Sequence, residues 1–249
     1  KADIVFEDEY FTGAQEHAYI ETNGVVAIAS KEKGVTVWGS IQCPYYVHKA
    51  MVSLFGLKED EVRIVFVMTG GAFGGKEDYP SNLAGYASLL SWKAAGRPVK
   101  MIYSREEDLL ATTKRHPCKT RVKSAFTKDG KMLALKIDAV MDGGAYVTLS
   151  TVVLSRGVLH SFGPYNCPNV EVDGRAVFTN SNPYGAFRGF GAPQTIFATE
   201  RHLDQIAEKL NMTPHELRLK NVLHKNDTMA TSQKDRKSTR LNSSHGKLS

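Results

Sequence analysis

The segment GGAFGGKE, at residues 70 to 77, has the composition of a ligand-binding loop. Gly70, four further residues, Gly75 and Lys76 match most of a phosphate-binding loop, in which backbone N–H groups and a lysine hold the phosphates. That pattern continues with a serine or threonine whose hydroxyl binds Mg²⁺, and Glu77 stands there instead. The segment therefore leaves three interpretations open: a nucleotide site, a loop for another ligand, and glycines that only permit tight turns.

Three features weaken the nucleotide interpretation. Glu77 places a negative charge where the magnesium-bound hydroxyl belongs. The residues EDYP, which end at Pro80, separate Lys76 from the following helix pattern, and proline has no N–H to donate. No later strand pattern ends in the acidic residue that completes a magnesium site. A nucleotide-binding module is therefore kept as an alternative from another functional class.

A second glycine-rich segment, NSNPYGAFRGFGAPQ at residues 180 to 194, follows a strand pattern and precedes a helix pattern. Its glycines would let the backbone approach a ligand closely: they are Gly185, Gly189 and Gly191. Arg188 is predicted to be buried and to supply charge for a phosphate or an oxyanion, and Phe187 or Phe190 to supply a flat apolar face. Taken alone, the segment also fits a simpler role, in which Arg188 braces the loop by binding carbonyls.

Strand and helix patterns place both segments on a mixed scaffold. Strand patterns occupy residues 25–30, 34–40, 63–68, 98–104 and 169–180, and a hairpin is predicted at 121–146 with Asp129-Gly130 as its two-residue turn. Helix patterns cover residues 45–57, 81–96, 194–210 and 213–223, with Ser81 and Thr213 as caps. Because strands and helices do not alternate strictly, the prediction is an α+β fold with mixed sheets and packed helices.

The composition limits the classes of partner. The chain has 249 residues, and no apolar run approaches the roughly 20 residues of a membrane span. Five lysines and arginines against Asp235 give residues 234–249 a charge of +4 out of the formal +6. This segment is polar and is predicted to be a disordered, non-native tail, so we expect neither a nucleic-acid nor a membrane partner. Cys43, Cys118 and Cys167 form no disulfide or metal spacing, which favours a reducing, cytoplasmic location.

Together the two glycine segments resemble the molybdopterin-binding subunit of the xanthine dehydrogenase and aldehyde oxidase family. The resemblance extends through AQEHAYIET at 14–22, GRPVKMIYSREEDLLATTKRHP at 96–117 and HELRLKN at 215–221. It covers essentially residues 1 to 230, which makes it far more specific than a single glycine motif. It implies that residues 1–233 form the first portion of a molybdopterin-binding catalytic domain, and the absence of an initial Met predicts a piece of a longer protein.

The resemblance implies a molybdenum–molybdopterin cofactor and assigns residues to it. The implied cofactor contacts are Gln42, Gly71, Phe73, Gly74 and Arg188. Gln42, Phe73 and Arg188 match positions that lie around the molybdenum without ligating it. An amide is a neutral hydrogen-bond donor, and the fixed charge of an arginine stabilises anionic cofactor ligands.

The resemblance also implies substrate contacts by Glu77, Arg156 and Phe190. A guanidinium stabilises the negative charge that spreads into a purine ring during attack on an electron-poor carbon, and a carboxyl group can hydrogen-bond ring nitrogens. The predicted reaction is therefore the oxidation of xanthine or hypoxanthine by insertion of water-derived oxygen. The alternatives are another N-heterocycle such as nicotinate, an aldehyde, or a scaffold protein without chemistry.

Other parts of the predicted enzyme lie outside this sequence. The resemblance places a glutamate general base beyond the C-terminus, so no catalytic residue is assigned within the chain. It also implies [2Fe–2S] clusters and FAD on further domains or partner subunits, and a homodimer of the complete enzyme. We therefore expect the chain to be inactive alone.

Overall fold

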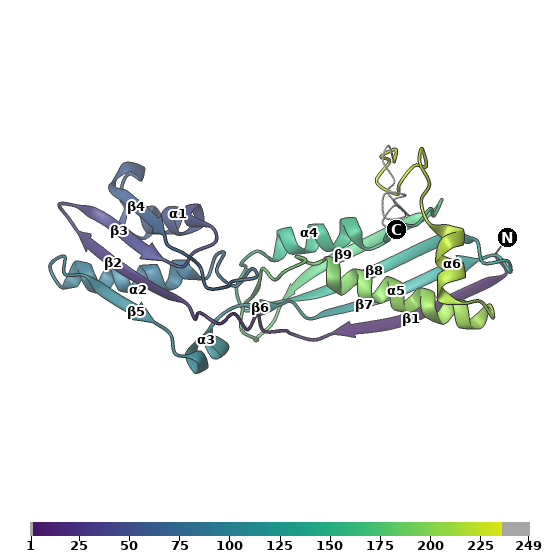
Figure 1. The fold of residues 1–249 in the computed structure, drawn as a ribbon, viewed down its shortest axis with the longest axis horizontal. Coiled ribbons are helices and arrows are strands. Elements are labelled where there is room, and N and C mark those ends of the chain that lie inside the picture. The colour runs from purple at the N-terminus through teal and green to yellow at the C-terminus, as the bar shows by residue number, and fades with distance from the viewer. Residues whose placement is uncertain (1, 236–249) are drawn as a thin grey trace, which may run out of the picture.

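The computed structural model describes residues 2–235 and shows an elongated molecule with two lobes (Figure 1). Each lobe has a four-stranded sheet with helices packed against it, which confirms the predicted α+β class. From residue 236 onward the predicted tail lies outside the described residues. No helix in residues 2–235 is long and apolar enough to cross a membrane.

The first lobe contains the sheet β4-β3-β2-β5, at the left of Figure 1. Its strands are β2 (Gly24–Ser30), β3 (Gly34–Gly39), β4 (Val62–Phe66) and β5 (Val99–Ile102). Strands β3 and β4 are parallel, whereas β2 runs antiparallel to β3 and to β5. Helices α1 (Pro44–Phe55) and α2 (Pro80–Lys93) supply the other half of a core that includes Val37, Met51 and Leu83.

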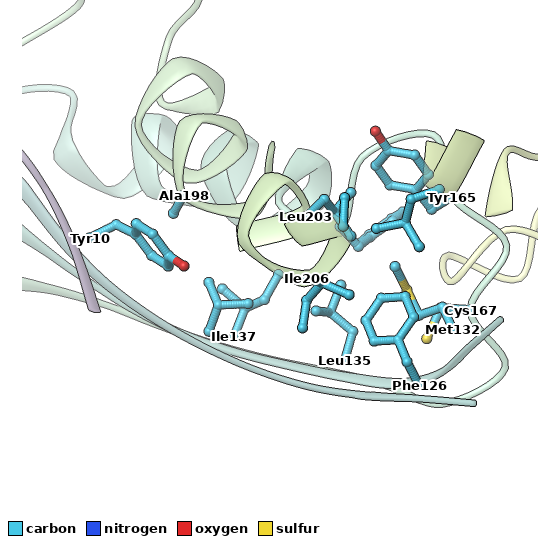
Figure 2. Packing of buried hydrophobic residues seen from close by; sticks show 14 residues of the cluster. Tyr10, Phe126, Met132, Leu135, Ile137, Tyr165, Cys167, Ala198, Leu203 and Ile206 are labelled. Carbon is cyan, nitrogen blue, oxygen red and sulfur yellow. The ribbon is translucent and has the colours of Figure 1, made fainter. Parts of the chain in front are cut away.

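The second lobe contains the sheet β1-β7-β8-β9, at the right of Figure 1. Its strands are β1 (Ile4–Thr12), β7 (Cys118–Phe126), β8 (Met132–Gly144) and β9 (Val170–Phe178). Its helices are α4 (Ser150–His160), α5 (Ala192–Lys209) and α6 (Pro214–Asn221). Figure 2 shows Leu203 and Ile206 of α5 packed toward Leu135, Ile137 and Phe126 of the sheet. Burying these side chains is the main stabilising contribution of this interface.

The sheet of the second lobe carries charged side chains that pair across neighbouring strands. Lys123 pairs with Glu7, Lys136 with Glu171, and Arg175 with Asp138. All of these side chains are more than a third exposed, that of Asp138 only just, at 34%. Strand β7 alternates buried and exposed residues along its length, so one face of the sheet forms the core and the other faces solvent.

Short elements complete the first lobe and connect it to the second. Helix α3 (Arg105–Ala111) and the 3₁₀ turn η1 (Glu59–Glu61) belong to the first half of the chain. Strand β6 (Lys114–Arg115) pairs in parallel with β10 (Tyr184–Gly185), which lies in the second glycine segment. Segments about 70 residues apart in sequence are therefore tied together where the lobes meet.

Several predicted elements are confirmed. Helix α1 ends at Gly56, which has the left-handed φ of 63°, and α6 begins with the capping box of Thr213 and Glu216. Strands β7 and β8 form the predicted antiparallel hairpin. The three cysteines are free.

Three details of the prediction are wrong. Helix α2 begins at Pro80 and ends at Lys93, so Ser81 lies inside the helix and is not its cap. The hairpin turn spans residues 127 to 131, closed by the Thr127 N–H bond to the Lys131 carbonyl, and is longer than the two residues expected. Helix α4 was not expected at all.

Candidate functional site

The first glycine loop, residues 67 to 79, joins β4 to α2 and is anchored by an ion pair. The Lys76 side chain is fully buried, and its Nζ donates to Glu21 Oε2 at 2.8 Å and to Ser40 Oγ at 3.0 Å. Glu21 Oε2 also accepts the Gly70 N–H at 2.7 Å. Because the ammonium group is engaged inside the protein, it is not available to a phosphate, which disfavours the nucleotide-binding alternative.

The charge state of the anchor follows from its contacts. Burial opposes ionisation of Glu21, but the hydrogen bonds from Lys76, Ser40 and Gly70 outweigh it and lower the pKa of Glu21 to about 2. The Lys76 Nζ also lies 4.9 Å from the centre of the Tyr19 ring. Glu21 is therefore ionised at neutral pH.

Gln42 fixes the next part of the same loop. Its Oε1 accepts the N–H groups of Gly74 at 3.0 Å and Lys76 at 3.3 Å, and its backbone N–H donates to the Lys76 carbonyl at 2.8 Å. Backbone N–H groups need an acceptor, so the amide oxygen must face the loop. The amide NH₂ has no partner among the described residues, so it is available for the donor role that the family resemblance implies.

The second glycine loop, residues 179 to 191, meets the first one directly. The Arg188 N–H donates to the Phe73 carbonyl at 2.8 Å. A Cβ on Gly74 would lie 2.8 Å from the Ala186 carbonyl carbon and oxygen, so the two backbones are in contact and only glycine fits. The structure thus brings together Phe73, Gly74, Gln42 and Arg188, four of the five predicted cofactor contacts.

Both loops have phenylalanines in the left-handed backbone region. Phe73 and Phe190 each have φ of 52°, a conformation that costs a non-glycine residue roughly 1–2 kcal/mol. Gly71, the fifth predicted cofactor contact, has φ of 101° and packs against Tyr19. Strain of this kind is retained where the surrounding contacts determine the backbone, and it is frequent at functional sites.

The expectation that Arg188 is buried is wrong. Its side chain is exposed and forms no hydrogen bond or ion pair with any other residue in 2–235, whereas its peptide groups are held on both sides. The guanidinium is therefore free to bind a ligand at the junction of the loops. Phe73 is also exposed, at 47%.

Glu77 lies at the end of the first loop, half-buried. Burial, with a smaller contribution from the negative charge of Asp78, raises the pKa of Glu77 above its ordinary value. The same two carboxyl groups add to the effect of burial in raising the pKa of the Cys43 thiol, which places all three near one another. The carboxyl group of Glu77 is thus a candidate to hydrogen-bond a heterocyclic nitrogen.

The other two predicted substrate contacts come from the second lobe. Phe190 is half-buried and packs against a buried cluster that includes Val153 of α4 and Met141 of β8. Arg156 lies on the exposed side of α4, and its side chain forms no hydrogen bond or ion pair in the part of the chain that the structure describes. No contact joins Arg156 to Glu77, so their joint grip on a substrate stays a prediction.

A cleft of about 960 Å³ opens between the lobes, and none of the predicted cofactor or substrate contacts lines it. Its walls include Asp78 and five tyrosines from both lobes, namely Tyr46, Tyr79, Tyr86, Tyr103 and Tyr146. Tyrosine rings give a large apolar surface with a polar end, which suits flat aromatic molecules.

The site lacks the side chains that would bind a metal ion directly. Within residues 2–235, no group of three or more His, Cys, Asp or Glu residues is placed to hold a metal. What the junction offers is close backbone approach, a free amide donor on Gln42 and a free guanidinium on Arg188. These groups fit a metal whose ligands are carried by an anionic organic cofactor.

The sequence patterns missed two supporting residues. Arg115 and Glu21 hold the loops in place, yet neither stands in a motif that predicts this task. The one available signal was position, because Glu21 lies in AQEHAYIET and Arg115 lies in the segment 96–117, both of which carried the family resemblance.

Known proteins match this chain over most of its length. A family model described as the molybdopterin cofactor-binding domain matches residues 1–222. The chain is 41% identical over 226 residues to a probable xanthine dehydrogenase subunit of Bacillus subtilis (strain 168), which covers 91% of this chain and 30% of that protein. It is 37% identical to the nicotinate dehydrogenase large molybdopterin subunit of Eubacterium barkeri, over 94% of this chain and 54% of that protein.

Solved structures show the same fold. The aldehyde oxidoreductase from Desulfovibrio gigas superposes with a TM-score of 0.87 at 33% identity, over 94% of this chain and 25% of that one. The chain therefore spans between a quarter and about half of the length of these three proteins.

Proposed function

Because this chain belongs to the family of molybdopterin cofactor-binding domains, we propose that it is part of the catalytic subunit of a molybdenum hydroxylase that oxidises a purine. The remaining parts of the enzyme, with the [2Fe–2S] clusters, the FAD and the glutamate base, would lie on other domains or subunits. The same proposal includes a homodimer in the cytoplasm.

One observation carries the proposal. The two glycine loops, more than 100 residues apart in sequence, are joined by the hydrogen bond between Arg188 and Phe73 and by the packing of Gly74 on Ala186. Had these loops been on opposite sides of the molecule, the predicted site could not exist. Their contact supports a single binding site at the junction of the lobes.

Each chain residue at the junction has a defined task in this proposal. Gln42 would donate its amide N–H to the cofactor, Arg188 would balance the negative charge of the cofactor, and Gly71, Phe73 and Gly74 would allow its close approach. When bound, the molybdenum cofactor supplies the redox chemistry, taking up the two electrons that leave the substrate. The chain itself binds and orients the reactants.

The choice of a purine rests on Glu77 and Arg156. Glu77 is half-buried at the end of the first loop, where burial raises the pKa of its carboxyl group, and this group can hydrogen-bond a ring nitrogen. The guanidinium of Arg156 is unpaired among the described residues, so its charge is available to a substrate carbonyl that becomes negative during the reaction.

A second candidate is the oxidation of another N-heterocycle. The 37% identity to a nicotinate dehydrogenase subunit, close to the 41% found for a xanthine dehydrogenase subunit, favours this alternative over an aldehyde. Nicotinate carries a carboxylate, which would pair with Arg156 in the ground state and gain little in the transition state.

The test is turnover by the holoenzyme that contains this chain, with xanthine, hypoxanthine, nicotinate and an aldehyde as substrates. We expect turnover with the purines, and a loss of roughly 100-fold in kcat with xanthine in Arg156→Met. Arg63→Met is the matched control, because Arg63 is an exposed arginine on β4. Oxidation of nicotinate or an aldehyde without any purine turnover would refute the substrate choice.

A further inference from the structure

Arg115 is a buried arginine behind the second glycine loop. Its guanidinium donates from Nη2 to the Arg188 carbonyl at 3.0 Å, from Nε to Gln15 Oε1 at 2.5 Å and from Nη1 to Gln194 Oε1 at 3.4 Å. Its own backbone N–H donates to the Gln15 carbonyl at 3.0 Å, and β6 fixes it beside β10. The three side-chain hydrogen bonds hold the guanidinium in one orientation, and the bond from Nη2 attaches it to the second loop.

No carboxylate neutralises this guanidinium. Arg115 is 7% exposed, yet its three acceptors are neutral, and it forms no ion pair in residues 2–235. Removing an unpaired charge from water is costly, so such a group is retained only where it meets a strong counterpart or has a task. Arg115 therefore differs from the arginines of the second lobe's sheet, such as Arg121 and Arg175, which pair with carboxylates.

Arg115 also contacts the ring of Phe187, which lies in the second loop. Its Cζ lies 3.8 Å from the centre of the Phe187 ring, and His17 stacks on the same ring with centroids 4.4 Å apart. The His17 Nε2–H donates to the Ala186 carbonyl at 2.7 Å, because a carbonyl can only accept. The His17 ring in turn packs on Gly75 of the first loop. Arg115 thus supports the second loop at the point where it meets the first.

The peptide groups of Arg188 are held from both sides. Phe73 of the first loop accepts its N–H, and Arg115 donates to its carbonyl. Directly after it the backbone is left-handed at Gly189, Phe190 and Gly191. A turn of this kind depends on its surroundings, because the conformation at Phe190 is unfavourable by itself.

We propose that Arg115 is a positioning residue. Its three hydrogen bonds, to Gln15, Gln194 and the Arg188 carbonyl, fix the backbone of the second loop and thereby the position from which the Arg188 guanidinium contacts the cofactor. The inference rests on the proposed function for the identity of the ligand. Lysine at this position would keep the charge but could not reproduce the planar fork of donors. A lysine substitution at Arg115 therefore distinguishes the effect of the hydrogen-bonding geometry from the effect of the positive charge.

The experiment compares Arg115→Lys and Arg115→Met in the holoenzyme that contains this chain. Supporting residues around a metal site typically contribute 10- to 100-fold, so we expect kcat to fall by roughly that factor in both variants, with little recovery in the lysine variant. The Mo(V) EPR spectrum should change in both. Arg121→Lys, an exposed arginine paired with Glu9, is the control and should leave kcat and the spectrum unchanged. A lysine variant with the kcat and the spectrum of the unmodified enzyme would overturn the proposal.

Two further measurements keep the inference testable on its own. If the Arg115 variants do not fold, as judged by circular dichroism, Gln15→Ala removes only an exposed partner of the guanidinium. It should change the spectrum in the same direction with a smaller loss of kcat, and an unchanged spectrum would refute the inference. If the unmodified enzyme binds no molybdenum, the proposed function fails. Amide hydrogen exchange of residues 185–191 then tests the inference about Arg115. We expect faster exchange in Arg115→Lys than in Arg121→Lys. Equal exchange in the two variants would count against the inference.

Discussion

The first glycine loop and the second one share a backbone design but differ in what holds them. In both, a left-handed phenylalanine stands near left-handed glycines, with φ of 101°, 52° and 105° at Gly71, Phe73 and Gly74, and of 93°, 52° and 94° at Gly189, Phe190 and Gly191. The first loop is anchored by the buried Lys76–Glu21 ion pair. The second is anchored by Arg115, which has only neutral acceptors, and by the neutral ring of His17.

The two anchors differ in the net charge that they leave at the junction of the loops. The ion pair of the first loop cancels its own charge and leaves the local potential nearly unchanged. Within residues 2–235 Arg115 has no carboxylate partner, so it leaves one positive charge behind the second loop, where it donates to the backbone carbonyl of Arg188. Positive potential from the guanidinium groups of Arg115 and Arg188 favours an anionic ligand at the junction. The first loop therefore provides shape, and the second loop provides shape and charge.

The largest expected effect is that acid weakens the second loop before the first. Burial lowers the pKa of His17, and lowers those of His116 and His202 to about 4. Below pH 6.5 the unfolded chain binds these protons and the folded chain does not, so the free energy of unfolding falls as pH falls from about 6.5 to 4, by several kcal/mol. The lowered pKa of Glu21 contributes stability above about pH 4.5, which is lost only as pH falls toward 2.

Thermal unfolding midpoints measured from pH 7 to pH 4 check this sequence of events. His17→Gln should flatten the dependence between pH 6.5 and 4.5, since glutamine does not titrate. Hydrogen exchange of residues 185–191, compared with residues 70–76, should report opening of the second loop first. Simultaneous opening of both loops would break the comparison.

The ion pair of the first loop should respond unequally to loss of its two partners. Glu21→Leu leaves a fully buried ammonium group without a counterion and should cost about 3–5 kcal/mol of unfolding free energy. Lys76→Met leaves a carboxylate whose side chain is 41% exposed and hydrated, so its cost should be clearly smaller. Denaturant titration of the two variants measures the difference. Equal costs would show that the pair does not act as described.

Gly74→Ala tests the contact between the loops. The added Cβ meets the Ala186 carbonyl at 2.8 Å on a backbone with φ of 105°, so crowding of about 1–3 kcal/mol should add to left-handed strain of about 1–2 kcal/mol. Gly56→Ala is the matched control, because Gly56 has φ of 63° and nothing lies within 4 Å of its Cβ position. The excess loss of stability in Gly74→Ala measures the loop contact, and no excess would contradict it.

The smallest expected effect is that of Phe187→Leu. The substitution keeps an apolar side chain but removes the ring that Arg115 and His17 contact, which should cost about 1 kcal/mol. Phe11→Leu is the control, since Phe11 is an exposed ring with a single lysine, Lys119, above it. A double variant with Arg115→Met should lose less than the sum of the single variants, because the contact is shared. Full additivity would argue against the shared contact.

Elements with strong local patterns were predictable from the sequence. Helix α6 has its capping box at Thr213 and Glu216, and α1 has Gly56 at its end, so both were found close to their true bounds. Helix α4 was missed because it has no side-chain cap, has β-branched residues at positions 151–153 and contains Gly157 in its interior. Tertiary packing, which local patterns do not record, stabilises α4.

The pairing of the two loops was predictable only through the family resemblance. Local composition made Arg188 look buried, whereas the structure buries Arg115 and leaves Arg188 exposed. From their sequence neighbours alone, Arg188 among glycines and Arg115 beside His116 are equally compatible with a buried or an exposed position. What separates them is the pairing of β6 with β10, a long-range contact between two-residue strands without any pattern of their own.

The packing of α4 on the second loop has a mechanical consequence. Gly157 and the Val153 carbonyl lie directly against the backbone of Gly191, where any Cβ would overlap them. Main chain touches main chain there, so no rotation of a side chain can absorb a sliding movement of the helix. Arg156 directly precedes Gly157 in this helix, so a movement of the α4 backbone at Arg156 would shift the turn at Phe190 with it.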